Sequence, residues 1–106
     1  NEPDTDPAMP ADPAWIDDLP LEDVDAVLVD TRWPEGAARA LSRARAANLP
    51  AILDADLPVP RDGALLRHAT HVAFSEPGLR DYALNDDLPR ALLEVARHTG
   101  AWCAVT

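Results

Sequence analysis

Four short apolar runs divide the chain, and a polar residue follows each of them. The runs cover residues 26–29, 51–53, 72–74 and 102–105, and the residues that follow are Asp30, Asp54, Ser75 and Thr106. Apolar runs of this length, separated by helix-patterned segments, predict strands buried on both faces of a parallel sheet. Ligands of such sheets bind outside the carboxyl ends of the strands. The four polar residues are therefore expected to gather at one edge of the sheet.

The segments between the runs carry helix signals. Apolar residues recur at helical spacing over residues 34–48, and a shorter helix is predicted over 61–69. Two later helices are predicted to begin after the caps Ser75 and Asp87, and Gly100 is predicted to end the last one. With right-handed crossovers, this order of elements predicts a three-layer, Rossmann-like α/β sheet.

Acidic residues and prolines dominate the beginning of the chain. Residues 1–23 contain eight acidic side chains, five prolines and no basic residue, and they predict a weakly ordered or surface-draped entry segment anchored by Trp15 and Ile16. The α/β part is predicted over residues 24–106. Because the chain has 106 residues and begins with Asn1, we expect a fragment or a processed chain, forming a partial domain.

Charge and cysteine content restrict the partners and the compartment. Nineteen acidic residues stand against nine arginines and no lysine, for a formal net charge of -10. This charge repels phosphate backbones and acidic membranes, so neither nucleic acid nor membrane is expected as a partner. No apolar stretch approaches the roughly 18 residues of a membrane span. The single cysteine, Cys103, can form no intrachain disulfide, which fits a cytoplasmic protein.

The residues suited to chemistry lie at the predicted strand ends. Arg32 can contact a phosphate, sulfonate or carboxylate, and Asp54 and Asp56 can orient hydroxyl groups or hold Arg32 in place. Backbone N–H groups after Ser75 can face an anion. The alternative is that these residues only cap helices and loops, as Asp and Ser do in many parallel sheets.

The same motifs, in this order, resemble the middle of PfkB-type (ribokinase-like) carbohydrate kinases, and they look most like the sulfofructose-kinase-like members. The resemblance covers about residues 24–106. It rests on Asp30-x-Arg32-Trp33, on Asp54-x-Asp56, on Phe74-Ser75-Glu76-Pro77-Gly78-Leu79, and on Ala104-Val105-Thr106, which looks like the opening of the family's Val-Thr-x-Gly segment.

The resemblance implies transfer of the γ-phosphoryl group of ATP to a sugar hydroxyl, with Mg²⁺ as cofactor. It implies that Arg32 contacts an anionic group of the sugar and that Asp54 and Asp56 line the region between substrate and phosphates. The residues that it places on the nucleotide side are Ser75, Glu76 and Thr106. It is also compatible with a homodimeric parent protein.

The chain departs from the family pattern in one motif, and two family segments lie outside it. Ser75 replaces the Asn of the family's Asn-x-x-Glu motif, and Gly78 stands where the second acidic residue would lie, so no metal ligand is assigned. The family's Gly-Ala-Gly-Asp segment, with its anion hole and base, would follow Thr106, and its Gly-rich start would precede Asn1. No catalytic residue is therefore assigned, and the chain is expected to be inactive alone.

Two other classes of function are compatible with this pattern of elements. In a receiver-like signalling domain, Asp54 would accept a phosphoryl group, but that fold needs a lysine late in the chain, and this chain has none. In a noncatalytic α/β interaction domain, the strand-end residues would be caps alone.

His68 and His71 form an H-x-x-H pair without a third ligand at a supporting spacing, and no metal site is expected there.

Overall fold

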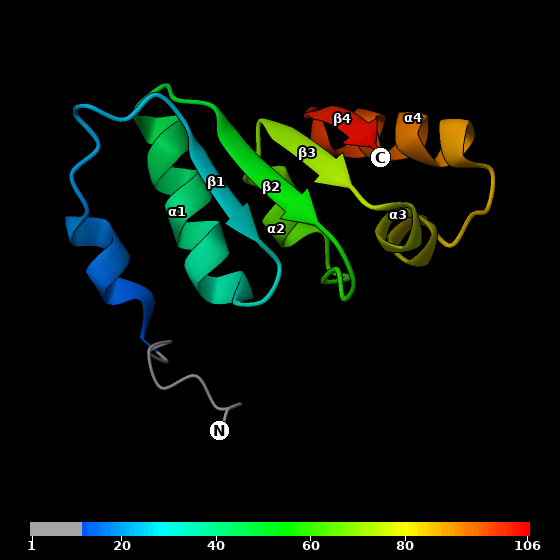
Figure 1. Cartoon of the computed structure of the whole chain (residues 1–106), viewed down its shortest axis with the longest axis horizontal. Helices are drawn as coiled ribbons and strands as arrows, with labels where there is room; N and C mark the ends of the chain where they lie inside the picture. Colours follow the sequence, from blue (N-terminus) through cyan, green and yellow to red (C-terminus); the bar gives the residue numbers. More distant parts are fainter. Residues whose placement is uncertain (1–11) are drawn as a thin grey trace.

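The computed structural model describes residues 12–106 and shows a four-stranded parallel sheet with helices. The part of the entry segment predicted over residues 1–11 lies outside the described residues. The elements are η1 (Pro13–Asp18), β1 (Val27–Asp30), α1 (Pro34–Ala46), β2 (Ala51–Ala55), α2 (Ala64–Arg67), β3 (His71–Phe74), α3 (Glu76–Ala83), α4 (Leu88–Thr99) and β4 (Trp102–Val105) (Figure 1). The strands lie in the order β1-β2-β3-β4. The parallel α/β sheet predicted from the sequence is confirmed.

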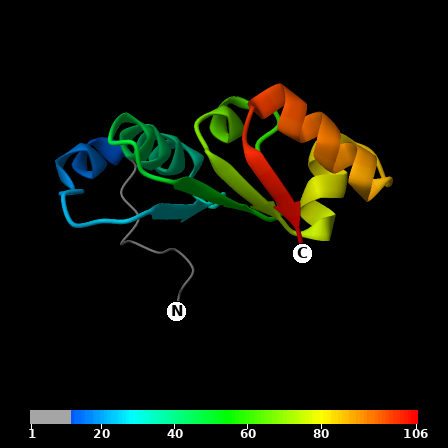
Figure 2. The same cartoon turned by 90° about the horizontal axis from the view of Figure 1, so that it is seen from above.

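All the helices that connect the strands lie on one face of this sheet. Each strand is added beside the previous one in the same direction, and right-handed crossovers in a constant direction return every helix to the same side. Figure 2 shows the helices above the sheet and none below it among residues 12–106. The described chain thus supplies the sheet and one helical layer. Within residues 12–106 the strands are buried on the helical side only, whereas the sequence predicted burial on both faces.

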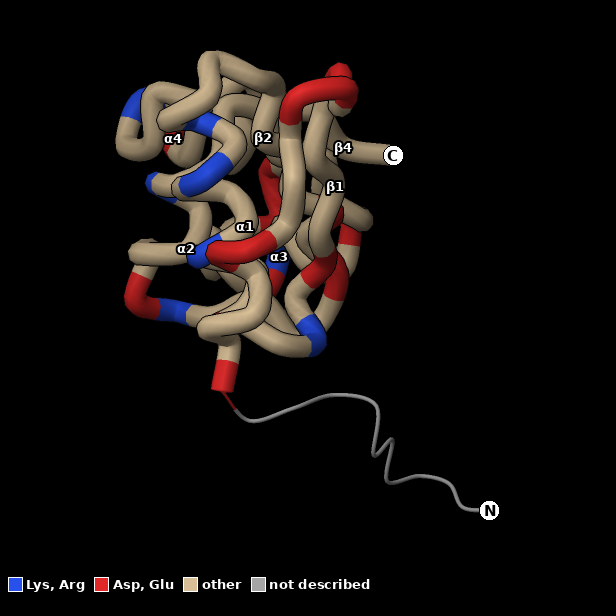
Figure 3. Tube along the Cα trace, turned by 90° about the vertical axis from the view of Figure 1, so that its left-hand side faces the viewer, with Lys and Arg blue, Asp and Glu red and all other residues tan. Residues whose placement is uncertain are grey.

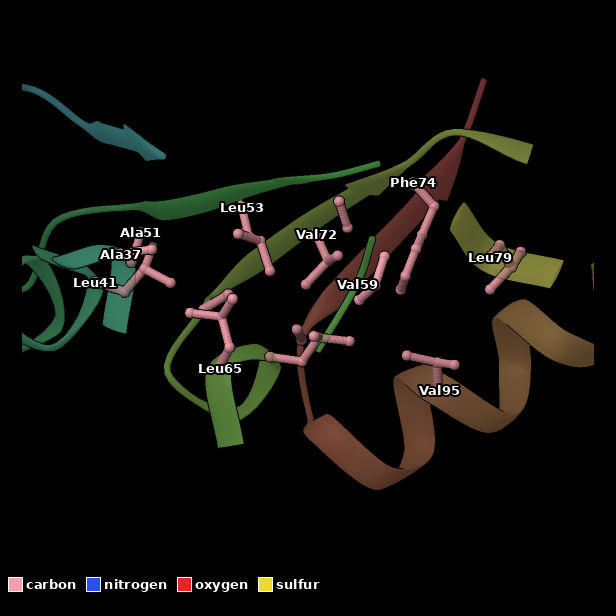
Figure 4. Packing of buried hydrophobic residues seen from close by; sticks show 14 of the residues in the cluster. Ala37, Leu41, Ala51, Leu53, Val59, Leu65, Val72, Phe74, Leu79 and Val95 are labelled. Atoms are coloured by element: carbon pink, nitrogen blue, oxygen red, sulfur yellow. The ribbon is translucent and has the colours of Figure 1, made fainter. Parts of the chain in front are cut away.

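The hydrophobic core lies between the sheet and the helices. Leu53, Val72 and Phe74 point from the sheet toward the helical layer, where Leu41 of α1 and Leu79 of α3 meet them (Figure 4). These five side chains are among the largest that are fully buried. Burying a side chain of this kind contributes roughly 1.5–3 kcal/mol. The one-sided core is therefore what holds the helices on the sheet.

The opposite side of the sheet is exposed, and we call it the open face. Strand residues alternate between the core and the open face, as the burial patterns of β2 and β3 show. Leu28 is 68% exposed and Trp102 is 78% exposed. In register across the sheet, the open face consists of the row Leu28, Ile52, His71 and Trp102 and the row Asp30, Asp54, Ala73 and Ala104.

The helix ends follow local sequence signals. The Ser75 side chain accepts a hydrogen bond from the Gly78 N–H in α3, and Asp87 caps α4 in the same way, as predicted. Gly100 ends α4 with a φ of 73°, in the left-handed region that glycine enters without strain. The helix predicted over residues 61–69 is shorter, because Gly63 in a left-handed conformation delays the start of α2 until Ala64.

The short helix η1 is attached to α1. Ile16 is buried, and the Arg43 guanidinium donates a hydrogen bond of 2.8 Å to the Ile16 carbonyl oxygen. The Arg39 guanidinium binds the Asp17 carboxylate at 3.1 Å. Ile16 therefore anchors the entry segment as predicted, whereas its neighbour Trp15 is 45% exposed. The division of the chain at residue 23 stays a prediction.

Basic residues lie mainly on the helical side of the molecule (Figure 3). Every arginine except Arg32 and Arg61 belongs to one of the helices α1 to α4. The open face carries Asp30 and Asp54 but no arginine.

None of the helices within residues 12–106 combines the length and the apolar character that crossing a membrane requires.

The one-sided core predicts unequal effects for two matched leucines on neighbouring strands of the 106-residue chain. Leu53→Ala should lower the free energy of unfolding by about 2–5 kcal/mol, because the fully buried side chain leaves a cavity. Leu28→Ala should change it by less than about 0.5 kcal/mol, because Leu28 lies on the open face. Urea unfolding followed by circular dichroism measures both, and equal losses would contradict this arrangement of the core.

Candidate functional site

The carboxyl ends of the four strands lie along one edge of the sheet, as predicted (Figure 1). Asp56, Ser75 and Thr106 follow β2, β3 and β4 at this edge. The position of Asp54 differs from the prediction: it lies within β2, which extends to Ala55, and does not follow the strand. Asp54 is exposed on the open face beside Asp30.

Arg32 is the exposed cation at this edge. Its side chain is 82% exposed, and its Nε donates to Asp30 Oδ2 at 3.0 Å while its backbone N–H donates to Asp30 Oδ1 at 3.0 Å. Asp30 thus holds Arg32, and the expectation that Asp54 and Asp56 hold it is wrong. An exposed pair of this kind contributes at most about 1 kcal/mol. The two terminal guanidinium nitrogens form no hydrogen bond within residues 12–106, so Arg32 keeps both NH2 groups as donors for an anion.

An apolar groove adjoins Arg32 along the outer edge of β1. Its volume is about 420 Å³. The rings of Trp15 and Trp33 stack in its wall with centroids 6.1 Å apart, and Leu28 and Asp30 also line it. The sequence indicated Trp33 beside Arg32 but gave no signal for the Trp15–Trp33 stack, because η1 brings together residues 18 positions apart. The groove offers an apolar surface next to a cation.

Asp56, Ser75 and Gly78 join the end of β2 to the beginning of α3. The Ser75 hydroxyl donates to Asp56 Oδ1 at 2.5 Å and accepts from the Gly78 N–H at 3.0 Å. The Leu57 N–H also donates to Asp56 Oδ1, at 2.8 Å. These hydrogen bonds stabilise the carboxylate form, the one from Ser75 most, and so lower the pKa of Asp56 below 3.8. We call this group the β2–α3 clamp.

Thr31 extends these contacts to β1, and sequence reasoning assigned it no role. Its side chain is 5% exposed, and its hydroxyl donates to the Asp56 carbonyl oxygen at 3.0 Å. The ends of β1, β2 and β3 are thus connected through Thr31, Asp56 and Ser75. A hydroxyl residue directly after a strand was the available signal, but such residues are frequent in loops.

The beginning of α3 does not fit a metal site. A Cβ atom on Gly78 would lie 2.5 Å from the Ala55 carbonyl oxygen, so an acidic side chain at this position requires α3 to move. The Ser75 hydroxyl already makes two hydrogen bonds, and Glu76 Oε1 lies 3.3 Å from a terminal nitrogen of Arg80. The described residues contain no group of three His, Cys, Asp or Glu side chains arranged to hold a metal ion.

The remaining residues named in the sequence analysis contact only their local neighbours. Glu76 and Thr106 are exposed, and the Thr106 N–H donates to the Phe74 carbonyl oxygen at 3.0 Å. His68 and His71 do not converge, because His68 Nδ1 lies 2.9 Å from the Ser42 hydroxyl and His71 Nδ1 lies 2.7 Å from that of its neighbour Thr70. Cys103 is half-buried against the core, and burial raises the pKa of its thiol.

A second groove lies on the helical side, away from the strand ends. Its volume is about 350 Å³, and Arg67, Tyr82, Glu94 and His98 are among its lining residues. Burial raises the pKa of Tyr82 above 10.0. The groove carries charges of both signs and lies apart from Arg32 and the β2–α3 clamp. It therefore adds nothing to the strand-end site.

The lowered pKa of Asp56 predicts a pH dependence of stability in the 106-residue chain. Because the folded pKa is depressed, the stabilisation is fully present above the ordinary carboxyl pKa of 3.8 and is lost as the pH falls through the folded value. Asp56→Asn should therefore lose less stability than the parent chain between pH 5 and pH 2, a range of about one to two units on either side of the ordinary aspartate pKa. Thermal unfolding at each pH measures this, with Asp54→Asn as the matched control. Equal pH profiles for all three proteins would contradict the role of the clamp.

The close approach at Gly78 predicts a reversed substitution effect. Replacing a glycine within a helix by alanine ordinarily stabilises it by about 1 kcal/mol. Gly78→Ala should instead lower the free energy of unfolding by about 1–3 kcal/mol, because the new Cβ would lie 2.5 Å from the Ala55 carbonyl oxygen. Urea unfolding measures the change, and a gain in stability would show that α3 does not dock this closely on β2.

Comparison with known proteins agrees with the observed fold. No family model matches the chain. A solved structure described as that of "a putative ribokinase from Agrobacterium tumefaciens" is similar to it, with 39% sequence identity and a TM-score of 0.70. The match covers 90% of this chain and 30% of that one, so the chain spans about a third of the length of the protein that it matches. The chain therefore has the α/β fold of part of a ribokinase-like protein.

Proposed function

We propose that the chain is the central part of an ATP-dependent sugar kinase that transfers the γ-phosphoryl group to a hydroxyl of an anionic sugar. One observation carries the kinase part of this proposal: 39% identity over 90% of the chain to a protein described as "a putative ribokinase". The arrangement of polar residues at the carboxyl edge of a parallel sheet supports it, because ligands bind there in such sheets.

Arg32 is the residue that we assign to the substrate. It is highly exposed, and it lies beside the groove formed by Trp15 and Trp33. The net charge of -10 opposes the approach of an anion, so an anionic sugar needs a placed cation of this kind. A guanidinium binds phosphate, sulfonate or carboxylate oxygens through two parallel hydrogen bonds. An acidic sugar, as in the sulfofructose-kinase-like members, is the substrate class that we propose.

In this proposal, the residues of the β2–α3 clamp position the sugar substrate. Asp56 is held by Ser75 at the end of β2, which fits a residue that orients a sugar hydroxyl. We place Ser75, Glu76 and Thr106 on the nucleotide side, where α3 begins and β4 ends. Asp54 lies on the open face beside Asp30, and its place in the substrate region stays a prediction.

Magnesium neutralises the charge of the ATP phosphates when it is bound in such kinases. The residues at the beginning of α3 do not fit a ligand set for it, because Gly78 has no carboxylate and Ser75 is occupied by Asp56 and Gly78. We therefore assign no residue of this chain to the metal. Any protein ligand of the metal is expected in the remainder of the protein.

The chemistry itself needs groups that the resemblance places beyond these residues. The anion hole and the base of the Gly-Ala-Gly-Asp segment would follow Thr106. Phosphoryl transfer depends on such positioned donors, so the 106-residue chain is proposed to be inactive alone. We further propose that the whole protein acts in the cytoplasm, and a homodimer is compatible with the resemblance.

The assignment of Arg32 predicts a selective loss of substrate affinity in the whole protein that contains these residues. Arg32→Gln should raise the KM for a phosphorylated or sulfonated sugar roughly 10- to 100-fold, since a hydrogen bond to a charged group contributes about 1.5–3 kcal/mol. The KM for ATP should not change. Sugar-dependent ADP release measures both constants.

The control for this prediction is Arg97→Gln, which makes the same change in net charge on α4, away from the strand ends. Its KM values should equal those of the parent protein. The 106-residue chain serves as the blank, with no sugar-dependent ATP consumption expected. An unchanged KM in Arg32→Gln would remove the substrate role of Arg32, and no kinase activity in the whole protein would favour the noncatalytic interaction domain.

A further inference from the structure

The groove on the helical side of the molecule has no role in the proposed function. It lies between the loop before α2, α2 itself, the last residues of α3 and the second half of α4, and its volume is about 350 Å³. Pockets for small molecules have volumes of about 300–1,000 Å³ and combine apolar surface with a few placed polar groups. The groove is large enough for a small ligand, and it is separate from the strand-end site.

Packing and hydrogen bonds hold the walls of this groove in place. The Tyr82 ring packs against Phe74 of the core, with the ring centroids 6.3 Å apart. The Arg61 guanidinium joins the loop before α2 to α3, because it donates to the carbonyl oxygen and to the carboxylate of Asp81 at 2.8 Å each. Val95 is buried and supplies apolar surface. A groove with fixed walls loses little conformational entropy when a ligand binds.

Two hydrogen-bond donors come together beside Gly63. A Cβ atom on Gly63 would lie 3.0 Å from the Tyr82 hydroxyl oxygen and 3.2 Å from a terminal nitrogen of Arg67, so these two groups are close to each other. Burial raises the pKa of Tyr82, so its hydroxyl keeps its proton at neutral pH. Within residues 12–106 the Arg67 guanidinium forms no ion pair. A hydroxyl beside a free guanidinium suits a carboxylate.

Negative charges line the same groove without neutralising this cation. Glu94 on α4 and Asp62 before α2 contribute the carboxylates. Neither forms an ion pair with Arg67, although a neighbouring carboxylate, that of Asp81, pairs with Arg61 at 2.8 Å. A simple anion would be attracted by Arg67 and repelled by the two carboxylates. A ligand that carries both charges can meet each of them with its opposite.

Glu94 and His98 are the acceptors best suited to a positive group. Asp62 Oδ1 already accepts a hydrogen bond from the Ala64 N–H at 3.1 Å. His98 Nδ1 lies 2.8 Å from the Glu94 carbonyl oxygen, which can only accept, so Nδ1 carries the hydrogen. Nε2 of the neutral ring is then an acceptor. The α4 side of the groove therefore suits an ammonium group.

We propose that this groove binds the zwitterion of a small α-amino acid with an apolar side chain. Its carboxylate binds Arg67 and Tyr82, its ammonium group pairs with Glu94, and its side chain packs on Val95. The amino acid is not a substrate of the proposed phosphoryl transfer, because the groove lies apart from the strand ends. The proposal does not depend on the proposed function.

The test is a saturation-transfer NMR titration of the whole protein with L-leucine, without ATP or sugar. We expect saturable binding with a Kd of about 1 mM or below, which a ligand of this size can reach. Isocaproate, which is leucine without the amino group, and isoamylamine, which is leucine without the carboxylate, should bind at least about tenfold more weakly. A weaker Kd for leucine, or an equal one for isocaproate, would overturn the proposal.

Two substitutions test the carboxylate contacts. Arg67→Gln should weaken leucine binding at least about tenfold, and Tyr82→Phe should weaken it about three- to tenfold while keeping the ring in the core. Arg97→Gln is the matched control, because it makes the same change in net charge on α4 outside the groove, and its Kd should not change. Equal Kd values for all three variants and the parent protein would overturn the proposal. Circular dichroism checks that each variant is folded.

Glu94→Gln tests the ammonium contact. It should weaken leucine binding at least about fivefold, because the charged partner is lost, and it should strengthen isocaproate binding, because a repelling carboxylate is removed. An equal loss for both ligands would contradict the ammonium contact and overturn the proposal. None of these measurements involves phosphoryl transfer, so a failure here leaves the kinase proposal standing, and an inactive whole protein leaves this one standing.

Discussion

Right-handed crossovers repeated in one direction determine the rest of this structure. Because each strand is added on the same side of the previous one, α1, α2, α3 and α4 all return to the same face of the sheet. The hydrophobic core around Leu53 and Phe74 can therefore form on that face alone. The same constraint aligns the carboxyl ends of the strands at one edge and leaves the other face exposed.

The residues of the β2–α3 clamp hold the beginning of α3 against the end of β2. Gly78 allows the first turn of α3 to approach the Ala55 carbonyl oxygen closely, and Ser75 uses its hydroxyl to bind Asp56 and to cap the helix. Because the Ser75 hydroxyl and the Gly78 N–H already bond to each other, fewer hydrogen-bonding groups at the beginning of α3 are left for a ligand. In the proposed function, recognition of an anion at this edge therefore falls to Arg32, which lies on the loop after β1 and is highly exposed.

Local signals in the sequence were sufficient for the order of the elements and for several helix ends. Ser75, Asp87 and Gly100 act at their helix ends as their residue types predict, because capping is decided within a few residues. The open face could not be predicted, because short apolar runs read alike whether one face is covered or two. The Asp30–Arg32 pair and the Thr31–Asp56 contact depend on loop geometry, which the pattern of residue types does not specify.

The neighbouring carboxylates of Asp30 and Asp54 also have a consequence for biosynthesis. A newly made chain presents the exposed row that contains Leu28, Ile52 and Trp102, and exposed apolar sheet surface promotes aggregation. Chains emerging from neighbouring ribosomes meet at high local concentration, where identical surfaces stack most readily. The carboxylates of Asp30 and Asp54 beside that row make such stacking between identical chains less favourable, because like charges repel one another.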